Sequence, residues 1–204
     1  MAKAPLKEPF RCSECGWSTS KWVGRCGECQ AWGSIDEGTR KLNVVAAGAV
    51  TATARPIGEV DLAAAQSRSS GVAELDRTLG GGLVPGAVVL LAGEPGVGKS
   101  TLLLTVAAES ARTGLTALYV TGEESTAQVR LRAERLSAIH PSLWLAAENE
   151  LSAVVAHIDA VKPDLLIIDS IQTMASAAVE GSPGGVTQVR EVANTAIRIA
   201  KDRG

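Results

Sequence analysis

From residue 69 onward, the sequence alternates between short apolar runs and stretches in which apolar residues recur at helical spacing. The apolar runs are four to six residues long, which is typical of buried strands. These runs lie at 87–92, 116–121, 143–146 and 165–168, and the helical stretches at 102–113, 125–136, 151–161 and 187–203. The alternation predicts an α/β fold with a mostly parallel sheet flanked by helices.

Local signals define several ends of these elements. A helical turn ends at the three glycines 80–82, and Gly114 is expected to end the next helix because glycine readily adopts the left-handed conformation. Ser125 and Gln128 match a capping box at the start of the following helix. The small, glycine-rich segment 174–186 predicts a mobile connection before the last helix.

The amino-terminal part of the chain has a different composition. Hydrophobic residues make up 46% of the chain but aromatic residues only 3%, so the main core is expected to be aliphatic. Four of the six aromatic residues nevertheless lie near the amino terminus, namely Phe10, Trp17, Trp22 and Trp32. Residues 38–68 have the composition of a linker. We therefore expect a small module at 1–37, a linker at 38–68 and the main domain at 69–204.

Charge and hydropathy exclude several classes of protein. The net charge of −2 argues against a generally basic surface for nucleic acid, so any such contact must be local. No run of eighteen apolar residues is present, and the first ten residues contain no apolar segment of the signal-peptide type. We expect a cytoplasmic protein that does not contact membranes.

All four cysteines lie in the first module, as two Cys-x-x-Cys pairs separated by ten residues: Cys12, Cys15, Cys26 and Cys29. Two such pairs can supply four thiolates to a tetrahedral Zn²⁺ ion, with no open position for catalysis. Two disulfides are a weaker alternative in a reducing compartment, and a rubredoxin-like iron site is another. Because so small a module buries little core, the metal is expected to supply much of its folding free energy.

Residues 93–101 match the phosphate-loop pattern G-x-x-x-x-G-K-[ST] between a predicted strand and a predicted helix. Backbone N–H groups of such a loop and the following helix N-terminus favour phosphate. Lys99 is expected to reach the β- and γ-phosphates of ATP, and the Ser100 hydroxyl to bind Mg²⁺. The predicted nucleotide-binding residues are Gly93, Glu94, Pro95, Gly96, Val97, Gly98, Lys99, Ser100 and Thr101.

Acidic residues follow two of the predicted strands. Asp169 closes the run at 165–168 in a Walker B pattern, and its carboxylate is expected to hold Mg²⁺ directly or through water. Glu123 and Glu124 follow the strand at 116–121 and stand where parallel sheets bind ligands. Either could orient the water that attacks the γ-phosphate. The alternative is that both only stabilise the N-terminus of the following helix.

Two blocks of sequence resemble a known family. The block 74–86, with Glu-Leu-Asp-Arg and Gly-Gly-Gly-Leu-Val-Pro-Gly, resembles RecA-like ATPases and, among them, the bacterial RadA (Sms) family of DNA repair and recombination proteins. Cys-Ser-Glu-Cys-Gly-Trp at 12–17, Lys-Trp-Val-Gly-Arg-Cys at 21–26 and Ala-Trp-Gly at 31–33 resemble the zinc finger of the same family. The resemblance covers almost the whole chain, least clearly in the linker.

The resemblance implies several roles that the residues alone do not. A glutamate at this strand end activates water in RecA-like proteins, which points to Glu123 or Glu124, with Glu123 slightly favoured. A DNA-contacting loop is implied at 174–186, where backbone N–H groups around Gly184 and Gly185, helped by Arg190, would reach phosphates. The resemblance also implies a homo-oligomeric ring, a hexamer, and a recombinase partner (RecA).

The leading hypothesis is a DNA-dependent ATPase with helicase activity that binds single-stranded DNA and processes branched recombination intermediates. An ATP-gated switch whose zinc finger docks a recombinase is the alternative. A clock-type autokinase also carries paired glutamates, but the zinc finger counts against it. The RecA-like core is expected to be incomplete at Gly204, so this amino-terminal portion could bind nucleotide without hydrolysing it.

Overall fold

A computed structural model describes residues 10–37, 49–50, 53–60, 62 and 65–203. The chain divides into two compact units, Met1–Arg55 and Pro56–Gly204, each with its own core. Within the described residues, no helix is long and apolar enough to cross a membrane.

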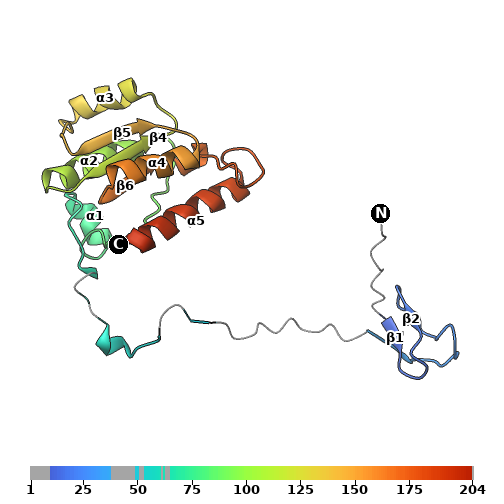
Figure 1. The fold of residues 1–204 in the computed structure, drawn as a ribbon. Coiled ribbons are helices and arrows are strands. Elements are labelled where there is room, and N and C mark those ends of the chain that lie inside the picture. The colour runs from blue at the N-terminus through green and yellow to red at the C-terminus, as the bar shows by residue number, and fades with distance from the viewer. Residues whose placement is uncertain (1–9, 38–48, 51–52, 61, 63–64, 204) are drawn as a thin grey trace. The chain divides into compact units, whose positions relative to one another are not determined.

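The first unit is a small antiparallel sheet. Its strands are β1 (Phe10–Cys12), β2 (Ser18–Thr19) and β3 (Ile35–Glu37), in the order β2-β1-β3 (Figure 1). Three buried residues, Cys12, Cys26 and Ile35, form its core, and Phe10, Trp17 and Val23 pack against them. Two of the three buried core residues are therefore predicted metal ligands.

The second unit contains a parallel sheet of three strands. They are β4 (Ala117–Thr121), β5 (Leu143–Ala147) and β6 (Leu165–Asp169), in the order β5-β4-β6. The helices, in chain order, are α1 (Ala73–Thr78), α2 (Lys99–Arg112), α3 (Thr126–Arg135), α4 (Leu151–Val161) and α5 (Val186–Arg203). Short 3-10 turns occur at η1 (Ile57–Glu59) and η3 (Ile171–Thr173).

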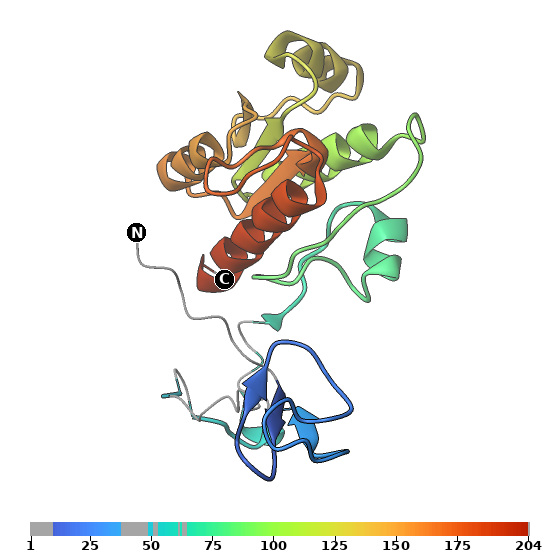
Figure 2. The ribbon, with the colours of Figure 1, turned by 90° about the vertical axis from the view of Figure 1, so that its right-hand side faces the viewer.

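Helices cover both faces of this sheet because alternate residues of β4 point to opposite sides. Ala117 and Tyr119 join a core with α2 and α3, whereas Leu118 and Val120 join a core with α4 and α5. Figure 2 shows α5 in red on the same side of the sheet as α4 in orange. The predicted α/β fold, a parallel sheet between helices preceded by a four-cysteine module, is confirmed.

Most predicted element boundaries agree with the structure. The capping box at Ser125 and Gln128 is present, with both of its reciprocal hydrogen bonds. Gly114 follows α2 with a φ of +94°, in the left-handed region that the prediction required. These signals act over a few residues, so they could be recognised without tertiary information.

The strand predicted at 87–92 is wrong. This segment is not a strand in the structure, and Val88, Val89 and Leu90 are 50%, 50% and 76% exposed. Strand β6 pairs with β4 along one edge, and no strand within the described residues pairs with its other edge. The run 87–92 therefore has the hydrophobicity of a buried strand, but it does not pair with this open edge of β6 and most of its side chains stay exposed.

Candidate functional site

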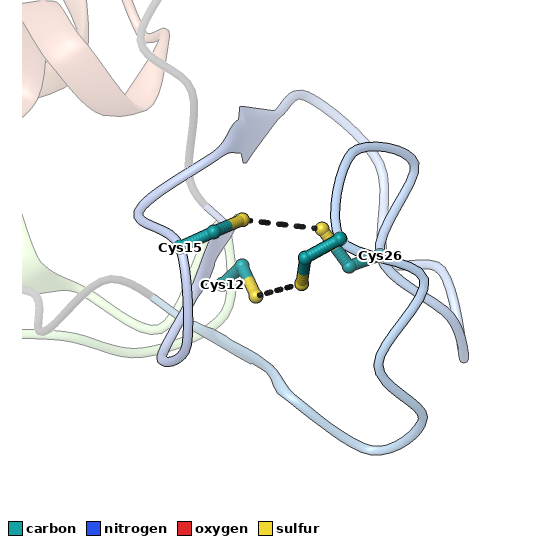
Figure 3. Close-up of side chains that lie close together, drawn as sticks. Cys12, Cys15 and Cys26 are labelled. Atoms are coloured by element: carbon teal, nitrogen blue, oxygen red, sulfur yellow. Dashed lines mark hydrogen bonds between the residues drawn. The ribbon is translucent and has the colours of Figure 1, made fainter.

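The four cysteines come together in the first unit as the sequence predicts. Their sulfur atoms all lie within 4.8 Å of one another. Figure 3 shows the close pairs, in which Cys15 Sγ lies 3.6 Å from Cys26 Sγ and Cys12 Sγ lies 3.7 Å from Cys29 Sγ. Zn–S bonds of about 2.3 Å give a tetrahedron with edges of roughly 3.8 Å, so these separations fit Zn²⁺. All four cysteines are free, which rules out the two-disulfide alternative in this structure.

Local hydrogen bonds favour the thiolate form of Cys12, which is the form that a metal requires. The Ser34 hydroxyl, 3.3 Å from Cys12 Sγ, and the backbone near Cys15 and Glu14 lower the pKa of the Cys12 thiol to about 6. Cys12 and Cys26 are buried, whereas Cys15 and Cys29 are exposed. The site therefore has two inner ligands that form part of the core and two outer ligands that border solvent.

The tryptophans of this unit have different surroundings. Trp17 packs against the core, and a Cβ placed on Gly27 would lie 2.9 Å from its ring. Trp22 and Trp32 are 65% and 77% exposed, and the Arg25 guanidinium lies 5.7 Å from the centroid of the Trp32 ring. One tryptophan thus completes the small core, while two are available for contacts with another molecule.

The phosphate loop has the backbone conformation that its glycines predict. Gly96 and Gly98 have φ values of +82° and +93°, in the left-handed region that side chains disfavour. Helix α2 begins directly afterwards at Lys99, and no side chain caps its N-terminus. Lys99 Nζ donates to the carbonyl oxygens of Gly93 (2.9 Å) and Glu94 (2.8 Å). The lysine therefore lies over the loop in which phosphate is expected to bind.

The topology directs this helix N-terminus toward the carboxyl edge of the sheet. Helix α2 packs against β4 and β6, and a short connection joins its last residues to the start of β4. Because the connection is short, α2 runs antiparallel to β4. The first residues of α2 therefore lie toward the carboxyl ends of β4 and β6. Ser100 is half-buried and Thr101 is exposed at this start of the helix.

The predicted acidic residues meet at that carboxyl edge. Thr121 and Asp169 are partners in the β4–β6 ladder, and Gly122 N donates to Asp169 O at 2.9 Å. The Ser170 hydroxyl donates to Glu123 Oε1 at 2.7 Å. Position 122 must be glycine, since a Cβ there would lie 2.1 Å from the Thr173 hydroxyl oxygen. This close packing brings Ser170, which follows β6, into contact with Glu123, which follows Gly122.

The two glutamates have different partners. Glu123 is exposed and accepts the Ser170 hydrogen bond next to Asp169. Glu124 forms an ion pair with Arg132 of α3, and both side chains are largely shielded from solvent. The backbone of Glu124 is also held, because its N–H donates to Thr121 Oγ1 and its carbonyl accepts from the same hydroxyl. The carboxylate of Glu124 is therefore engaged with α3, whereas that of Glu123 faces the end of β6.

Sequence reasoning missed a residue that contacts Asp169. The Tyr119 hydroxyl donates to Asp169 Oδ2 at 2.5 Å, and Tyr119 is 1% exposed. Burial, together with the adjacent Asp169 carboxylate, raises the pKa of the Tyr119 phenol. The available signal was that a single tyrosine occurs in the middle of a predicted buried strand in an otherwise aliphatic core.

The glycine-rich loop contains a second residue that sequence reasoning missed. Gln188 of α5 is buried, accepts from Ser176 N at 2.7 Å, and has its amide nitrogen 2.9–3.2 Å from the carbonyl oxygens of Ser176, Val179 and Gly181. Gln188 therefore contacts the first half of the segment 174–186, for which mobility stays a prediction. Its second half, with Gly184 and Gly185, is exposed.

The predicted DNA-contacting residues lie close in sequence but not in one cluster. Gly184 has a φ of +78°, and the Gly185 N–H donates to Ser182 O at 3.0 Å, so it takes part in a turn. Arg190 is exposed on the first turns of α5. All three residues are exposed to solvent.

The fold and these sites define a P-loop ATPase domain that carries a four-cysteine metal ribbon. The sequence model of the AAA domain family matches residues 54–204, and the chain belongs to this family. A model described as the rubredoxin metal binding domain matches residues 10–37.

Individual relatives extend this assignment. The chain is 50% identical to the DNA repair protein RadA of Mycolicibacterium smegmatis, over 98% of this chain and 45% of the relative. It is 43% identical to the DNA repair protein RadA of Haemophilus influenzae, over 100% of this chain and 46% of the relative. The resemblance to the RadA family is confirmed, and the chain spans less than half the length of these curated relatives.

Proposed function

We propose that this chain is the nucleotide-binding and zinc-binding part of a DNA-dependent ATPase that acts in DNA repair in the bacterial cytoplasm. The observation that carries the proposal is the common edge of the sheet, where the phosphate loop, Asp169 and Glu123 are directed. The similarity to DNA repair proteins named RadA supplies the DNA substrate. We assign the zinc module to 1–37, the linker to 38–68 and the ATPase portion to 69–204.

The residues of this edge divide the chemistry among them. Backbone N–H groups of 96–100 and the start of α2 would bind the phosphates of ATP, and Lys99 would exchange its two loop carbonyls for phosphate oxygens. Ser100 and Asp169 offer the hard oxygen ligands that Mg²⁺ prefers. Bound Mg²⁺ would neutralise part of the negative charge of the phosphates.

Glu123 is the better candidate for the residue that orients water. Its carboxylate lies at the end of β4 beside Ser170, whereas Glu124 is committed to the ion pair with Arg132. A positioned carboxylate that accepts a proton contributes about 10²–10⁴-fold to such reactions. We assign Glu123 to this catalytic role and Glu124 to the attachment of α3 to the sheet edge.

We further propose that the complete protein forms a hexameric ring on single-stranded DNA and unwinds branched recombination intermediates. The exposed half of the loop, with Gly184, Gly185 and Arg190, would contact DNA phosphates through backbone N–H groups and the guanidinium. Gln188 holds the other half of the loop by hydrogen bonds, so the exposed half would present DNA with a partly ordered surface.

One observation favours a second function, in which ATP gates the binding of a partner such as a recombinase. Trp22 and Trp32 are exposed on the zinc unit, and exposed tryptophans beside an arginine are frequent centres of protein interfaces. In this function, nucleotide state would control docking of the zinc unit with little DNA-driven turnover.

The test is ATP hydrolysis by the complete protein with and without single-stranded DNA, beside a Lys99→Ala variant. We expect DNA to stimulate hydrolysis and the variant to abolish the stimulated rate, because Lys99 is the cation directed at the phosphate loop. A forked DNA substrate in the same reactions reports unwinding. Nucleotide binding with a rate indifferent to DNA would contradict the motor and leave the partner-docking switch as the better account.

A further inference from the structure

Tyr119 of the second unit has a polar hydroxyl to which the proposed ATPase function assigns no role. It lies at the centre of β4 among aliphatic side chains of α2, α3 and the sheet. A phenol in such a core is costly to bury unless its hydroxyl has a hydrogen-bond partner. That partner is Asp169 Oδ2, at 2.5 Å.

The strand register explains why the tyrosine reaches this carboxylate. Tyr119 is paired with Ile167 in the parallel ladder, and Asp169 follows Ile167 by two residues. Side chains two apart in a strand point to the same face, so Tyr119 and Asp169 are diagonal neighbours on one face of the sheet. The ring of a tyrosine is long enough to span such a diagonal.

This face is the one that α2 covers. Tyr119 and Ile167 share a core with Leu104, Ala107 and Ala108 of that helix. The carboxylate of Asp169 is therefore presented on the side of the sheet that carries the phosphate-loop helix. With Oδ2 bonded to the phenol, the orientation of the carboxyl group is restrained, and Oδ1 is the oxygen directed away from the tyrosine.

We propose that Tyr119 is a positioning residue that holds the Asp169 carboxylate in the orientation required to bind the Mg²⁺ ion of bound nucleotide. The proposal rests on the proposed function, because it assumes that Asp169 is a Mg²⁺ ligand. The phenol acts through Asp169 and does not contact the ion. Loss of a hydrogen bond that orients a metal ligand typically lowers metal affinity about 10–100-fold.

The first experiment measures binding of a fluorescent ATP analogue to the chain as Mg²⁺ is titrated. It compares the wild type with Tyr119→Phe, Asp169→Asn and the double variant. We expect Tyr119→Phe to raise the half-maximal Mg²⁺ concentration about tenfold, because the ring remains but the restraint on Asp169 is lost. Asp169→Asn should raise it further, and the double variant should match Asp169→Asn alone.

The variants separate the possible failures. If Asp169→Asn leaves the Mg²⁺ midpoint unchanged, the proposed role of Asp169 is wrong. If Asp169→Asn shifts the midpoint and Tyr119→Phe does not, the tyrosine is only a packed core residue and the inference is overturned. An effect of Tyr119→Phe that persists in the Asp169→Asn background would also overturn it, since the tyrosine would then act by another route.

A matched control accounts for general loss of stability. Thr195→Val removes a buried hydroxyl from α5, on the opposite face of the sheet, and should lower the thermal midpoint without moving the Mg²⁺ midpoint. An equal Mg²⁺ shift in Thr195→Val would contradict the specific role of Tyr119.

A second measurement leaves the tyrosine in place, in case Tyr119→Phe does not fold. The chain contains one tyrosine, so uniform incorporation of 3-fluorotyrosine labels position 119 alone. Addition of Mg²⁺ to the nucleotide-bound chain should shift its ¹⁹F resonance, and the shift should be absent in Asp169→Asn. A resonance that does not respond to Mg²⁺ in the wild type would overturn the proposal.

Discussion

At the residue scale, adjacent side chains of the same type acquire different roles from their partners. Glu123 and Glu124 are equivalent in the sequence pattern, yet one accepts from Ser170 and the other pairs with Arg132. Ser170 follows β6, 47 residues from Glu123 along the chain, whereas Arg132 lies in α3, 8 residues from Glu124. Chemistry at this edge of the sheet is therefore assigned by contacts across elements.

This difference predicts opposite effects of two conservative substitutions. Glu123→Gln should lower the rate of ATP hydrolysis by the complete protein at least about 100-fold and leave nucleotide affinity nearly unchanged, because an amide cannot accept the proton from water. Glu124→Gln should retain most of the rate but lower the thermal midpoint, since Arg132 loses its charged partner. Steady-state hydrolysis, nucleotide titration and thermal unfolding measure the three quantities. The reverse assignment would follow if Glu124→Gln alone abolished hydrolysis.

At the element scale, one side chain of α5 determines how the preceding loop is held. Residues 176–181 lie outside regular secondary structure, so their backbone groups lack helix or strand partners. The Gln188 side chain supplies hydrogen bonds to several of these groups, which would be costly to bury unpaired. Helix α5 itself is anchored by Val192, which is 0% exposed beneath the sheet. The loop and the helix thus form one structural unit.

The Gln188 hydrogen bonds predict slow hydrogen exchange in the segment 176–181. Gln188→Ala should increase hydrogen exchange at 176–181, because loss of a buried amide and its partners costs about 1–3 kcal/mol of local opening free energy. Thr187→Ala, an exposed neighbour on the same helix, is the matched control and should leave exchange unchanged. If both variants exchange like the wild type, Gln188 does not restrain the loop. Mass spectrometry of peptic peptides resolves the two halves of the loop.

At the scale of the whole molecule, the two units depend on different sources of stability. The second unit has two aliphatic cores, one on each face of its sheet. The buried core of the first unit consists of two cysteines and one isoleucine, so the metal must supply much of its folding free energy. The units are therefore expected to unfold separately.

Removal of the metal tests this expectation. A strong zinc chelator should unfold 10–37 and change the fluorescence of Trp17, which packs against the cysteine core, while the unfolding transition of 56–204 is unchanged. Cys26→Ser should show the same loss without chelator. Glu14→Gln, an exposed change between two ligands, is the control and should bind one Zn²⁺ ion per chain. Retention of the fluorescence after complete zinc removal would show that the unit folds without metal.

The sequence by itself determined the features that depend on neighbouring residues. The phosphate loop, the capping box at Ser125 and the paired cysteines each occupy a short stretch, and their geometry follows from local backbone and ligand requirements. The alternation of apolar runs and helical stretches likewise predicted the α/β class. These parts of the fold and of the candidate site could be predicted without coordinates.

Only the tertiary structure decided which distant residues meet. The apolar run at 87–92 is not a strand and does not pair with the open edge of β6, because hydrophobicity alone does not specify backbone pairing between segments. The bond from Tyr119 to Asp169 joins residues 50 positions apart and depends on the register of β4 against β6. A shift of that register by one residue would turn these side chains to opposite faces of the sheet. Local chemistry thus specified the components of the site, and strand pairing specified their contacts.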